Sequence, residues 1–365
     1  MNNKQLILID KVVGLVLLPC SLVFRAITLF RRSSDHQDNQ PILIIKFLGA
    51  GNFLSLRDSL RPLNTHIITS ITNKQSLEEF QIGQKVYYLN DKNPALLLID
   101  VIKTFGILFF SRYSQVINLE PESFFAKFLC AIPVSQKTSG VSNTHKGLMD
   151  SLIYDSYLVT PNLINKSEIL SLLIQFEPKE NPELATLISS IQEGLKKNFA
   201  NVLLNADRIA IAPTCSSTDS LRRLDIQAWR VLLGHLQSHA QIKVLFPSSE
   251  DEQFEGFLQL TKAYPNLQIE VTNYSDFVHN IQNADLVVTI DSQALHIAQL
   301  FNKPTIGFYG PTSPFGVNLG KNTFPITRSL ACSPCTHKYF EAPCKGKAPC
   351  MKFHQSDLKI FNASP

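Results

Sequence analysis

Four polar residues that follow one buried apolar run carry the clearest chemistry in this sequence. Residues 286–290 (LVVTI) read as a strand buried on both faces, and Asp291, Ser292, Gln293 and His296 come directly after it, where a helix is predicted to begin. The carboxyl ends of parallel strands are where α/β folds bind ligands, and the N–H groups at a helix start favour phosphate. The sequence therefore predicts an anion or nucleotide site here.

The elements around these residues follow the order strand, helix, strand. Ala294 opens the apolar face of the predicted helix, Lys303-Pro304 ends it, and residues 305–309 form the next strand before a G-P-T turn. A lone histidine on such a helix is often structural. A ligand contact and a packing role for His296 therefore both stay open.

A second group of polar residues is predicted at the strand ends of the N-terminal half. Residues 42–45 read as a buried strand, followed by Gly49 and Gly51, which let the chain turn tightly. Residues 113–119 read as another buried strand, with Glu120 at its carboxyl end. Because strand ends of one parallel sheet converge, we expect Glu120 near that turn. It is either a catalytic carboxylate or a carboxylate that the dipole favours at a helix start.

Length and composition fit two domains of ordinary size. The chain has 365 residues, of which 44% are hydrophobic, and a net charge of +4. No dense Lys/Arg stripe with interleaved aromatic residues is present, which argues against nucleic-acid binding. We expect an N-terminal segment and linker at 1–40, domains at 41–180 and 181–352 with a hinge near 177–182, and a tail at 353–365.

The C-terminal half is predicted to alternate strands and helices. Strands are expected at 208–212, 241–247 and 267–271, and a helix at 274–284. The G-x-G-x-x-G loop of dinucleotide-binding domains is absent from this half, which argues against an NAD or FAD enzyme. The polar stretch at 133–147, in the other half, is predicted to be a loop.

The N-terminal segment differs from the rest in hydropathy. Residues 12–24 are almost wholly apolar, residues 26–30 resume the run after Arg25, and Arg31-Arg32 closes it. A membrane-spanning helix needs about 20 apolar residues, a length that this segment reaches only by including Arg25. We favour an interfacial helix that lies on a bilayer. A single span, a signal peptide and a helix packed on the protein's own surface are the alternatives.

Four of the seven cysteines lie close together in the sequence, as C-x2-C-x8-C-x5-C: Cys332, Cys335, Cys344 and Cys350. Two close pairs among turn-forming residues can wrap a tetrahedral Zn²⁺. A cytosolic chain would keep such thiols reduced, which favours a metal over two disulfides. The cluster is predicted to be structural, and a zinc site and free thiols both stay open.

One motif resembles that of a known family. The pattern D-[ST]-x-x-x-H-[IL]-A, then K-P and a strand ending in G-P-T-x-P, resembles the nucleotide-sugar signature of glycosyltransferase family 9, the lipopolysaccharide heptosyltransferases and their relatives. The resemblance covers about residues 41–352. It implies an α/β fold of GT-B architecture, in which two Rossmann-like, doubly wound domains face each other across a cleft. The N-terminal domain would bind the acceptor and the C-terminal domain the nucleotide sugar. Transfer would need no metal or other cofactor, because helix N-termini and basic side chains stabilise the leaving diphosphate.

The resemblance also implies roles for single residues. The donor contacts that it implies are Asp291, Ser292, Gln293, Ala294, His296, Arg222, Thr214 and Ser248. Arg222 stands where the family has a lysine seven residues before an aromatic residue, here Trp229. Arginine can hold a diphosphate through two hydrogen bonds, so the charge is preserved although the geometry differs. The other interpretation is a solvated basic pair of Arg222 with Arg223.

The N-terminal motif of the family, strand-K-x-x-x-x-G-D, is degenerate in this chain. Lys46 and Gly51 match it, with Gly49 in the same acceptor-side loop, but Asn52 stands where the family has an Asp that acts as base on the acceptor hydroxyl. An amide has no useful basicity. Either Glu120 accepts the proton instead, or the chain is catalytically altered.

Together these features predict a glycosyltransferase. It would move a heptose or related sugar from a nucleoside-diphosphate sugar, of ADP-heptose type or another, to a hydroxyl of a lipid-linked or lipopolysaccharide-type envelope glycan. We expect it at the cytoplasmic face of the bacterial inner membrane, bound peripherally or by a single N-terminal anchor. Two alternatives are a nucleotide-sugar-binding protein that has lost transfer, motivated by Asn52, and a membrane-associated scaffold with a metal-binding cysteine knuckle.

Overall fold

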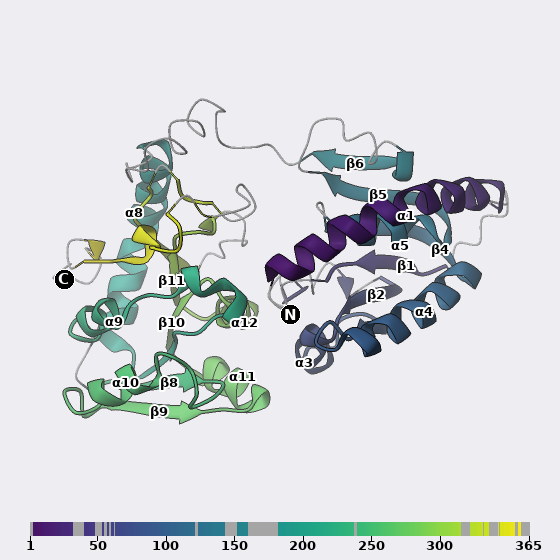
Figure 1. The fold of residues 1–365 in the computed structure, drawn as a ribbon. Helices are drawn as coiled ribbons and strands as arrows, with labels where there is room; N and C mark the ends of the chain where they lie inside the picture. Colours follow the sequence, from purple (N-terminus) through teal and green to yellow (C-terminus); the bar gives the residue numbers. More distant parts are fainter. Residues whose placement is uncertain are drawn as a thin grey trace. The chain divides into compact units, whose positions relative to one another are not determined.

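The computed structural model contains two compact units, Met1–Leu163 and Ile164–Pro365 (Figure 1). The described residues are 3–31, 40–47, 53–54, 57, 60–61, 63–120, 123–142, 152–159, 182–236, 239–314, 322–330, 332–335, 342, 344–354 and 357–358. Gly49, Gly51 and Asn52 lie outside them, as does nearly all of the predicted hinge at 177–182. The predicted domain limits therefore stay a prediction.

The N-terminal unit is built on a six-stranded parallel sheet in the order β3-β2-β1-β4-β5-β6. Its strands are β1 (Ile42–Ile45), β2 (Thr65–Ser70), β3 (Lys85–Leu89), β4 (Arg112–Asn118), β5 (Val134–Ser142) and β6 (Ser156–Val159). Its helices are α1 (Asn3–Arg31), η1 (Ile71–Asn73), α3 (Lys74–Glu79), α4 (Pro94–Phe110) and α5 (Phe124–Ala131).

The C-terminal unit has a second six-stranded parallel sheet, in the order β12-β11-β10-β7-β8-β9. Its strands are β7 (Arg208–Ala212), β8 (Gln241–Phe246), β9 (Leu267–Val271), β10 (Leu286–Ile290), β11 (Thr305–Tyr309) and β12 (Thr323–Thr327). Its helices are α8 (Pro182–Asn205), η2 (Ser217–Arg222), α9 (Ile226–Leu233), α10 (Phe254–Leu260), α11 (Tyr274–Asn283), α12 (Gln293–Leu300) and η4 (Pro349–Met351).

The two sheets share one topology. In each, the first strand along the chain lies between the second and the fourth, so the winding reverses between β1 and β4 in the N-terminal unit and between β7 and β10 in the C-terminal unit. This is the doubly wound order, and ligands bind outside the carboxyl ends of the two strands at such a reversal. The predicted α/β class is therefore confirmed, and both reversal points are places to look for a site.

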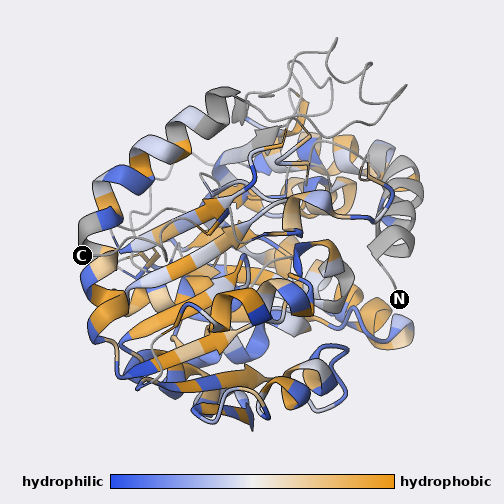
Figure 2. Ribbon diagram, turned by 90° about the vertical axis from the view of Figure 1, so that its left-hand side faces the viewer, coloured by the Kyte–Doolittle hydropathy of each residue, from blue (hydrophilic) through white to orange (hydrophobic). Residues whose placement is uncertain are grey.

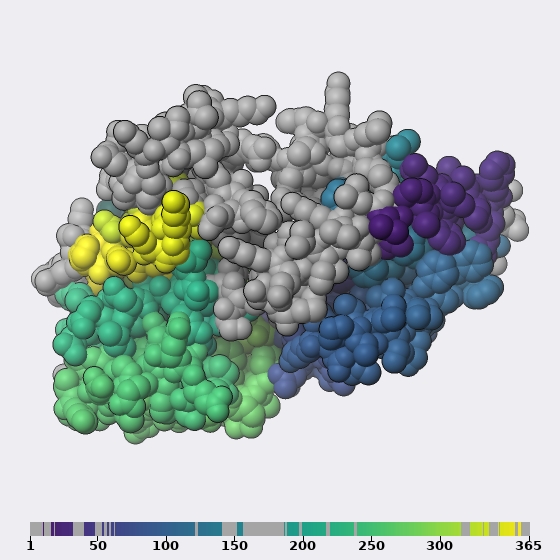
Figure 3. Space-filling model, in the orientation of Figure 1, coloured from purple at the N-terminus to yellow at the C-terminus, as the bar shows by residue number. Residues whose placement is uncertain are grey.

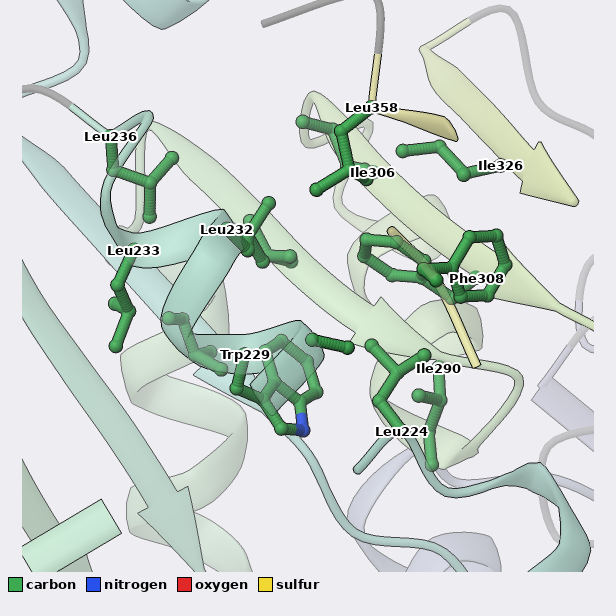
Figure 4. Close-up of a cluster of buried hydrophobic side chains, with 14 of the residues drawn as sticks. Leu224, Trp229, Leu232, Leu233, Leu236, Ile290, Ile306, Phe308, Ile326 and Leu358 are labelled. Atoms are coloured by element: carbon green, nitrogen blue, oxygen red, sulfur yellow. The ribbon is translucent and has the colours of Figure 1, made fainter. Parts of the chain in front are cut away.

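The sheet of the C-terminal unit forms because its strands are apolar on both faces. All five residues of β10 and of β11 are buried, as expected for strands covered by helices on either side. Figure 2 shows hydrophobic colour along the strands, whereas the helices alternate between hydrophobic and hydrophilic. Trp229 and Leu232 of α9 pack against this sheet in one core with Ile290 and Phe308 (Figure 4). This packing fixes the strand ends that carry the polar residues.

The structure corrects the predicted loop at 133–147, because β5 is a strand between β4 and β6. Its polar residues can be buried because they bond to one another and to neighbours. The hydroxyls of Ser135 and Thr138 lie 3.0 Å apart, and the Thr138 N–H donates to the Asp155 carboxylate at 2.7 Å. Buried polar groups with such partners are tolerated in a sheet, and hydropathy alone does not reveal them.

Helix α1 packs on the N-terminal unit itself, along α5 and β5 (Figure 1). Near its start, the Asp10 carboxylate accepts hydrogen bonds from the N–H groups of Phe124 and Phe125, at 3.0 and 3.1 Å, and so caps α5. Near its end, Arg25 is buried beside Asp155, at 2.6 Å. The predicted alternative of packing on the protein's own surface therefore holds for one face of α1. Among the described residues, no helix is long and apolar enough to cross a membrane.

Candidate functional site

A buried ion pair marks the reversal point of the C-terminal sheet. Asp291 directly follows β10, and its carboxylate lies 3.4 Å from the Arg222 guanidinium at the end of η2. The same Arg222 nitrogen donates to the Asp291 carbonyl at 2.9 Å. Arg222 and Asp291, which are 69 positions apart in the sequence, are therefore brought together as the predicted donor site requires. Arg222 is not one of two solvated arginines.

The start of α12 presents polar groups at this reversal point. Ser292 is its N-cap, and the Ser292 hydroxyl accepts a hydrogen bond from the Ala294 N–H at 3.3 Å. The Thr289 hydroxyl lies 3.1 Å from that of Ser292 and donates to the Ala212 carbonyl at 2.9 Å, which ties β10 to β7. The first turn of a helix exposes N–H donors at the positive end of its dipole, which favours a phosphate.

His296 lies one turn along α12 and is almost completely buried, with 6% of its surface exposed. Burial lowers its pKa below 6.5, partly opposed by the Asp291 carboxylate and reinforced by Arg222. The imidazole is therefore neutral at pH 7. Among the described residues, its Nδ1 has no hydrogen-bond partner. A buried ring nitrogen without a partner costs free energy, so a ligand that bonds to it would be favoured.

The remaining predicted donor residues lie at the same end of the sheet but are less closely engaged. Thr214 follows β7 and is half-buried, and Ser248 follows β8, where its hydroxyl accepts from the Glu250 N–H at 3.1 Å. The Gln293 amide donates to the Tyr274 hydroxyl at 2.7 Å. Ala294 is buried under the helix and offers only its backbone. These contacts are consistent with structural roles.

Two features of this end of the sheet were not predicted from the sequence. Tyr309, the last residue of β11, is fully buried, and no described residue is a hydrogen-bond partner of its hydroxyl. Burial and the Asp291 charge raise the pKa of Tyr309 well above 10. Arg223 forms an ion pair with Asp251 at 2.8 Å, where the sequence offered a solvated basic pair with Arg222. The position of Tyr309 at a strand end, directly before the G-P-T turn, is the signal that could have found it.

The reversal point of the N-terminal sheet also holds an ion pair. Lys46 follows β1 and lies 3.5 Å from the Glu120 carboxylate, which follows β4. The same carboxylate oxygen accepts from the Phe47 N–H at 2.9 Å, and the Glu120 N–H donates to the Asn118 side chain at 2.8 Å. Glu120 and Lys46 are thus brought together as predicted. The predicted neighbours Asn52, Gly49 and Gly51 lie outside the described residues.

The cysteine cluster supports the loop that follows β11. Cys332, Cys335, Cys344 and Cys350 are all buried thiols, without disulfides. Among the described residues, no group of three or more His, Cys, Asp or Glu side chains is placed to hold a metal ion, so the structure does not support the predicted zinc site. Two of these cysteines contact the start of the loop after β11. The Cys335 N–H donates to the Pro311 carbonyl at 2.8 Å, and the Cys350 sulfur packs against Gly310.

The chemistry available at the two reversal points is charge stabilisation on one unit and proton acceptance on the other. Arg222, the α12 N-terminus and neutral His296 can hold an anionic group with a few convergent donors. Glu120, acceptor-only when ionised, can take a proton.

Comparisons with known proteins agree with this fold. The chain resembles E. coli heptosyltransferase WaaC with ADP-2-deoxy-2-fluoro heptose, with 16% identity, 88% of this chain and 98% of that chain covered, and a TM-score of 0.54. It also resembles the glycosyl transferase family 9 structure from Veillonella parvula, with 13% identity, 79% and 85% covered, and a TM-score of 0.54. At such identities the likeness shows the fold alone, which is GT-B-like as predicted.

Two sequence comparisons bear on the family. A stretch of 43 residues is 51% identical to lipooligosaccharide heptosyltransferase 2 of Haemophilus influenzae, but it spans only 12% of that protein's length and 12% of this chain. The model of "Glycosyltransferase family 9 (heptosyltransferase)" matches residues 111–345, which is more than half of the chain. That match includes Glu120, Arg222 and Asp291. The chain therefore belongs to glycosyltransferase family 9, the heptosyltransferase family.

Proposed function

We propose that this chain transfers a sugar, a heptose or a related one, from a nucleoside-diphosphate donor to a hydroxyl of a lipid-linked or lipopolysaccharide-type envelope glycan. The observation that carries the proposal is the buried group of Arg222, Asp291 and His296 at the start of α12. The similar structure of E. coli heptosyltransferase WaaC is one with ADP-2-deoxy-2-fluoro heptose, which makes an ADP sugar the first donor to test.

On the donor side, the leaving diphosphate needs compensation for the negative charge that develops. Arg222 supplies a cation and the α12 N-terminus supplies oriented N–H groups, while the Asp291 carboxylate holds Arg222 in place. Neutral His296 and the Tyr309 hydroxyl add two buried polar atoms that no described residue bonds. This set can bind a diphosphate without a metal ion.

On the acceptor side, we assign proton acceptance to Glu120. The acceptor oxygen would attack the anomeric carbon, its proton would pass to the Glu120 carboxylate, and the electron pair of the breaking carbon–oxygen bond would leave with the diphosphate. Lys46 at 3.5 Å and the Phe47 N–H at 2.9 Å both contact the same Glu120 oxygen and hold the carboxylate in place at the strand end.

Two experiments on the full chain test this proposal. Calorimetric titration with ADP, UDP, GDP and CDP should show selective binding of one diphosphate, and Arg222→Ala should weaken it by roughly 10- to 100-fold, since a hydrogen bond to a charged group contributes about 1.5–3 kcal/mol. Arg230→Ala is the matched control, because Arg230 is exposed on α9 of the same unit. A folded protein that binds none of the four would contradict donor binding and favour the scaffold alternative.

The second experiment separates transfer from binding. With the matching nucleotide sugar and a lipid-linked acceptor, Glu120→Gln should abolish most of the turnover while leaving the dissociation constant of the diphosphate unchanged. An unchanged rate would show that Glu120 is not the base. Tight donor binding without turnover in the unaltered chain would favour the second candidate function, a nucleotide-sugar-binding protein. The amide Asn52, where the family has an acidic residue, favours that candidate.

A further inference from the structure

Two helices of the N-terminal unit expose large apolar side chains to solvent. On α1, Val16, Val23 and Phe30 are 70%, 58% and 92% exposed. On α4, Leu98, Ile102 and Phe110 are 61%, 62% and 79% exposed. We call the exposed side of residues 16–30 and 96–110 the α1–α4 face. A surface helix normally turns polar residues outward, so this arrangement on two helices requires an explanation.

The two parts of the face are continuous because the helices are in contact. The Phe24 ring of α1 meets the rings of Phe105 and Phe109 of α4 edge to face, at 5.3 and 6.2 Å between centroids. The Arg31 guanidinium donates to the Phe109 carbonyl at 3.0 Å. Figure 3 shows the purple atoms of α1 meeting the blue atoms of α4 on one side of this unit. The contacts fix α1 and α4 as one surface.

On α4 the exposed apolar residues form a continuous stripe along the helix. Leu98, Ile102 and Phe110 follow a spacing of four, with Gly106 completing the row, so they line one stripe along the helix. Within this helix, Lys103 is the one exposed charged residue. Sequence patterning pointed to the N-terminal segment as membrane-active but gave no such role to α4.

Among the side chains that the structure describes on the two helices, the exposed charged ones are basic. The acidic residues of the two helices are turned to backbone N–H groups: Asp10 caps α5, and Asp100 accepts from the Asn90 N–H at 3.0 Å. Lys103 lies on the exposed side of α4, with exposed Lys92 before its start and Arg112 after its end. An apolar face edged by basic residues is complementary to a bilayer surface with anionic headgroups.

We propose that the α1–α4 face docks this protein on an anionic lipid bilayer. The exposed apolar side chains would enter the boundary between headgroups and acyl chains, and the basic residues would remain among the headgroups. Protein interfaces are enriched in aromatic residues, Met and Arg, whereas most of the exposed residues of this face are Val, Leu and Ile, which favours lipid over a second copy of the chain. Helix α1 acts here as a fixed part of the fold and not as a free anchor.

Vesicle flotation of the purified full chain tests the proposal. We expect binding to vesicles of phosphatidylcholine mixed with phosphatidylglycerol, and weaker binding to phosphatidylcholine alone. The double variant Ile102→Gln/Phe110→Gln should lower the partition coefficient at least about tenfold, because each side chain loses apolar area that the bilayer would bury. Val23→Gln/Phe30→Gln should do the same from α1. Circular dichroism should show that these exposed substitutions leave the fold intact.

The matched control is Leu258→Gln/Val271→Gln in the C-terminal unit, where the two residues are 44% and 54% exposed, and it should bind vesicles like the unaltered chain. Absence of binding to either vesicle type would overturn the proposal, as would binding that the α4 and control variants reduce equally. A chain that stays off vesicles and dimerises, with the α4 variant monomeric by light scattering, would assign the face to a second copy instead. Diphosphate titration of the same samples reports separately on the donor site.

Discussion

The attachment of α1 to its unit gives a sharp test, because one of its contacts is a buried ion pair whose two partners can be removed separately. The Arg25 side chain is 7% exposed, and its two terminal nitrogens reach Asp155 at 2.6 Å and the Thr138 hydroxyl at 3.1 Å. We predict that Asp155→Ala destabilises the N-terminal unit more than Arg25→Met does. The asymmetry follows from which partner is left buried.

The magnitudes follow from the two exposures. Leaving a buried charge unpaired costs about 3–5 kcal/mol, and because the Asp155 side chain is 31% exposed we reduce the cost of Asp155→Ala to about 2–3 kcal/mol. The lost acceptor of the Thr138 N–H adds about 1 kcal/mol. Arg25→Met keeps an apolar stem in the site and leaves Asp155 with solvent, so we expect a cost below about 1.5 kcal/mol.

Urea unfolding of the full chain, followed by circular dichroism, measures the free energies, and hydrogen exchange of α1 amides assigns the loss to this helix. The double variant should be destabilised by about 2 kcal/mol less than the sum of the two single variants, since each substitution removes the same pair. If Arg25→Met were the costlier change, or if α1 exchange were the same in all variants, the pair would not hold α1. The helix would then behave as a detachable anchor.

Two further predictions concern the C-terminal unit. Burial holds the pKa of His296 below its unfolded value of 6.5, so below that pH the unfolded chain takes up a proton more readily than the folded chain. The free energy of unfolding should therefore fall as the pH decreases below 6.5, by up to about 1.4 kcal/mol per pH unit. Denaturation across this range should show the slope, and His296→Gln should make it shallower, while His66, whose pKa burial also lowers, keeps contributing. An equal slope in both proteins would refute the assignment. Gly310→Ala would place a Cβ 2.5 Å from the Met351 sulfur and 2.9 Å from that of Cys350, and should cost about 1–3 kcal/mol by overpacking. Gly194→Ala, which meets no atom within 4 Å on α8, is the control and should stabilise the protein in a thermal melt.

Hydropathy predicted the buried parallel strands well because such strands are apolar throughout. Residues 42–45, 208–212, 286–290 and 305–309 are strands with the predicted limits. Strand β5 was missed since its buried serine and threonine residues are stabilised by partners on other elements. A one-dimensional pattern carries no record of such partners, so polar strands look like loops.

The site was predictable to the extent that topology decides it. Asp291 and Glu120 were placed from one rule, that polar residues at the carboxyl ends of parallel strands lie together at one edge of the sheet, and each has a basic partner there. Tyr309 was missed because a tyrosine that ends an apolar strand reads as core, and its orphan hydroxyl is visible only in three dimensions. The burial of Arg25 was hidden for the same reason: Asp155 lies 130 positions away.

The ion pair of Arg222 with Asp291 suggests how charge would affect diphosphate binding at the start of α12. A carboxylate beside a diphosphate is repulsive unless its charge is compensated, so Asp291 fits a diphosphate site only while Arg222 neutralises it. Removing Arg222 would thus do more than delete one contact. It would leave the Asp291 carboxylate uncompensated beside the bound anion, and Asp291 is only 5% exposed to solvent. Arg222→Ala should therefore weaken the binding of a diphosphate more than the double substitution Arg222→Ala/Asp291→Asn does. Arg222 and Asp291 would then act as one unit, with the carboxylate setting the position of the cation that meets the phosphate.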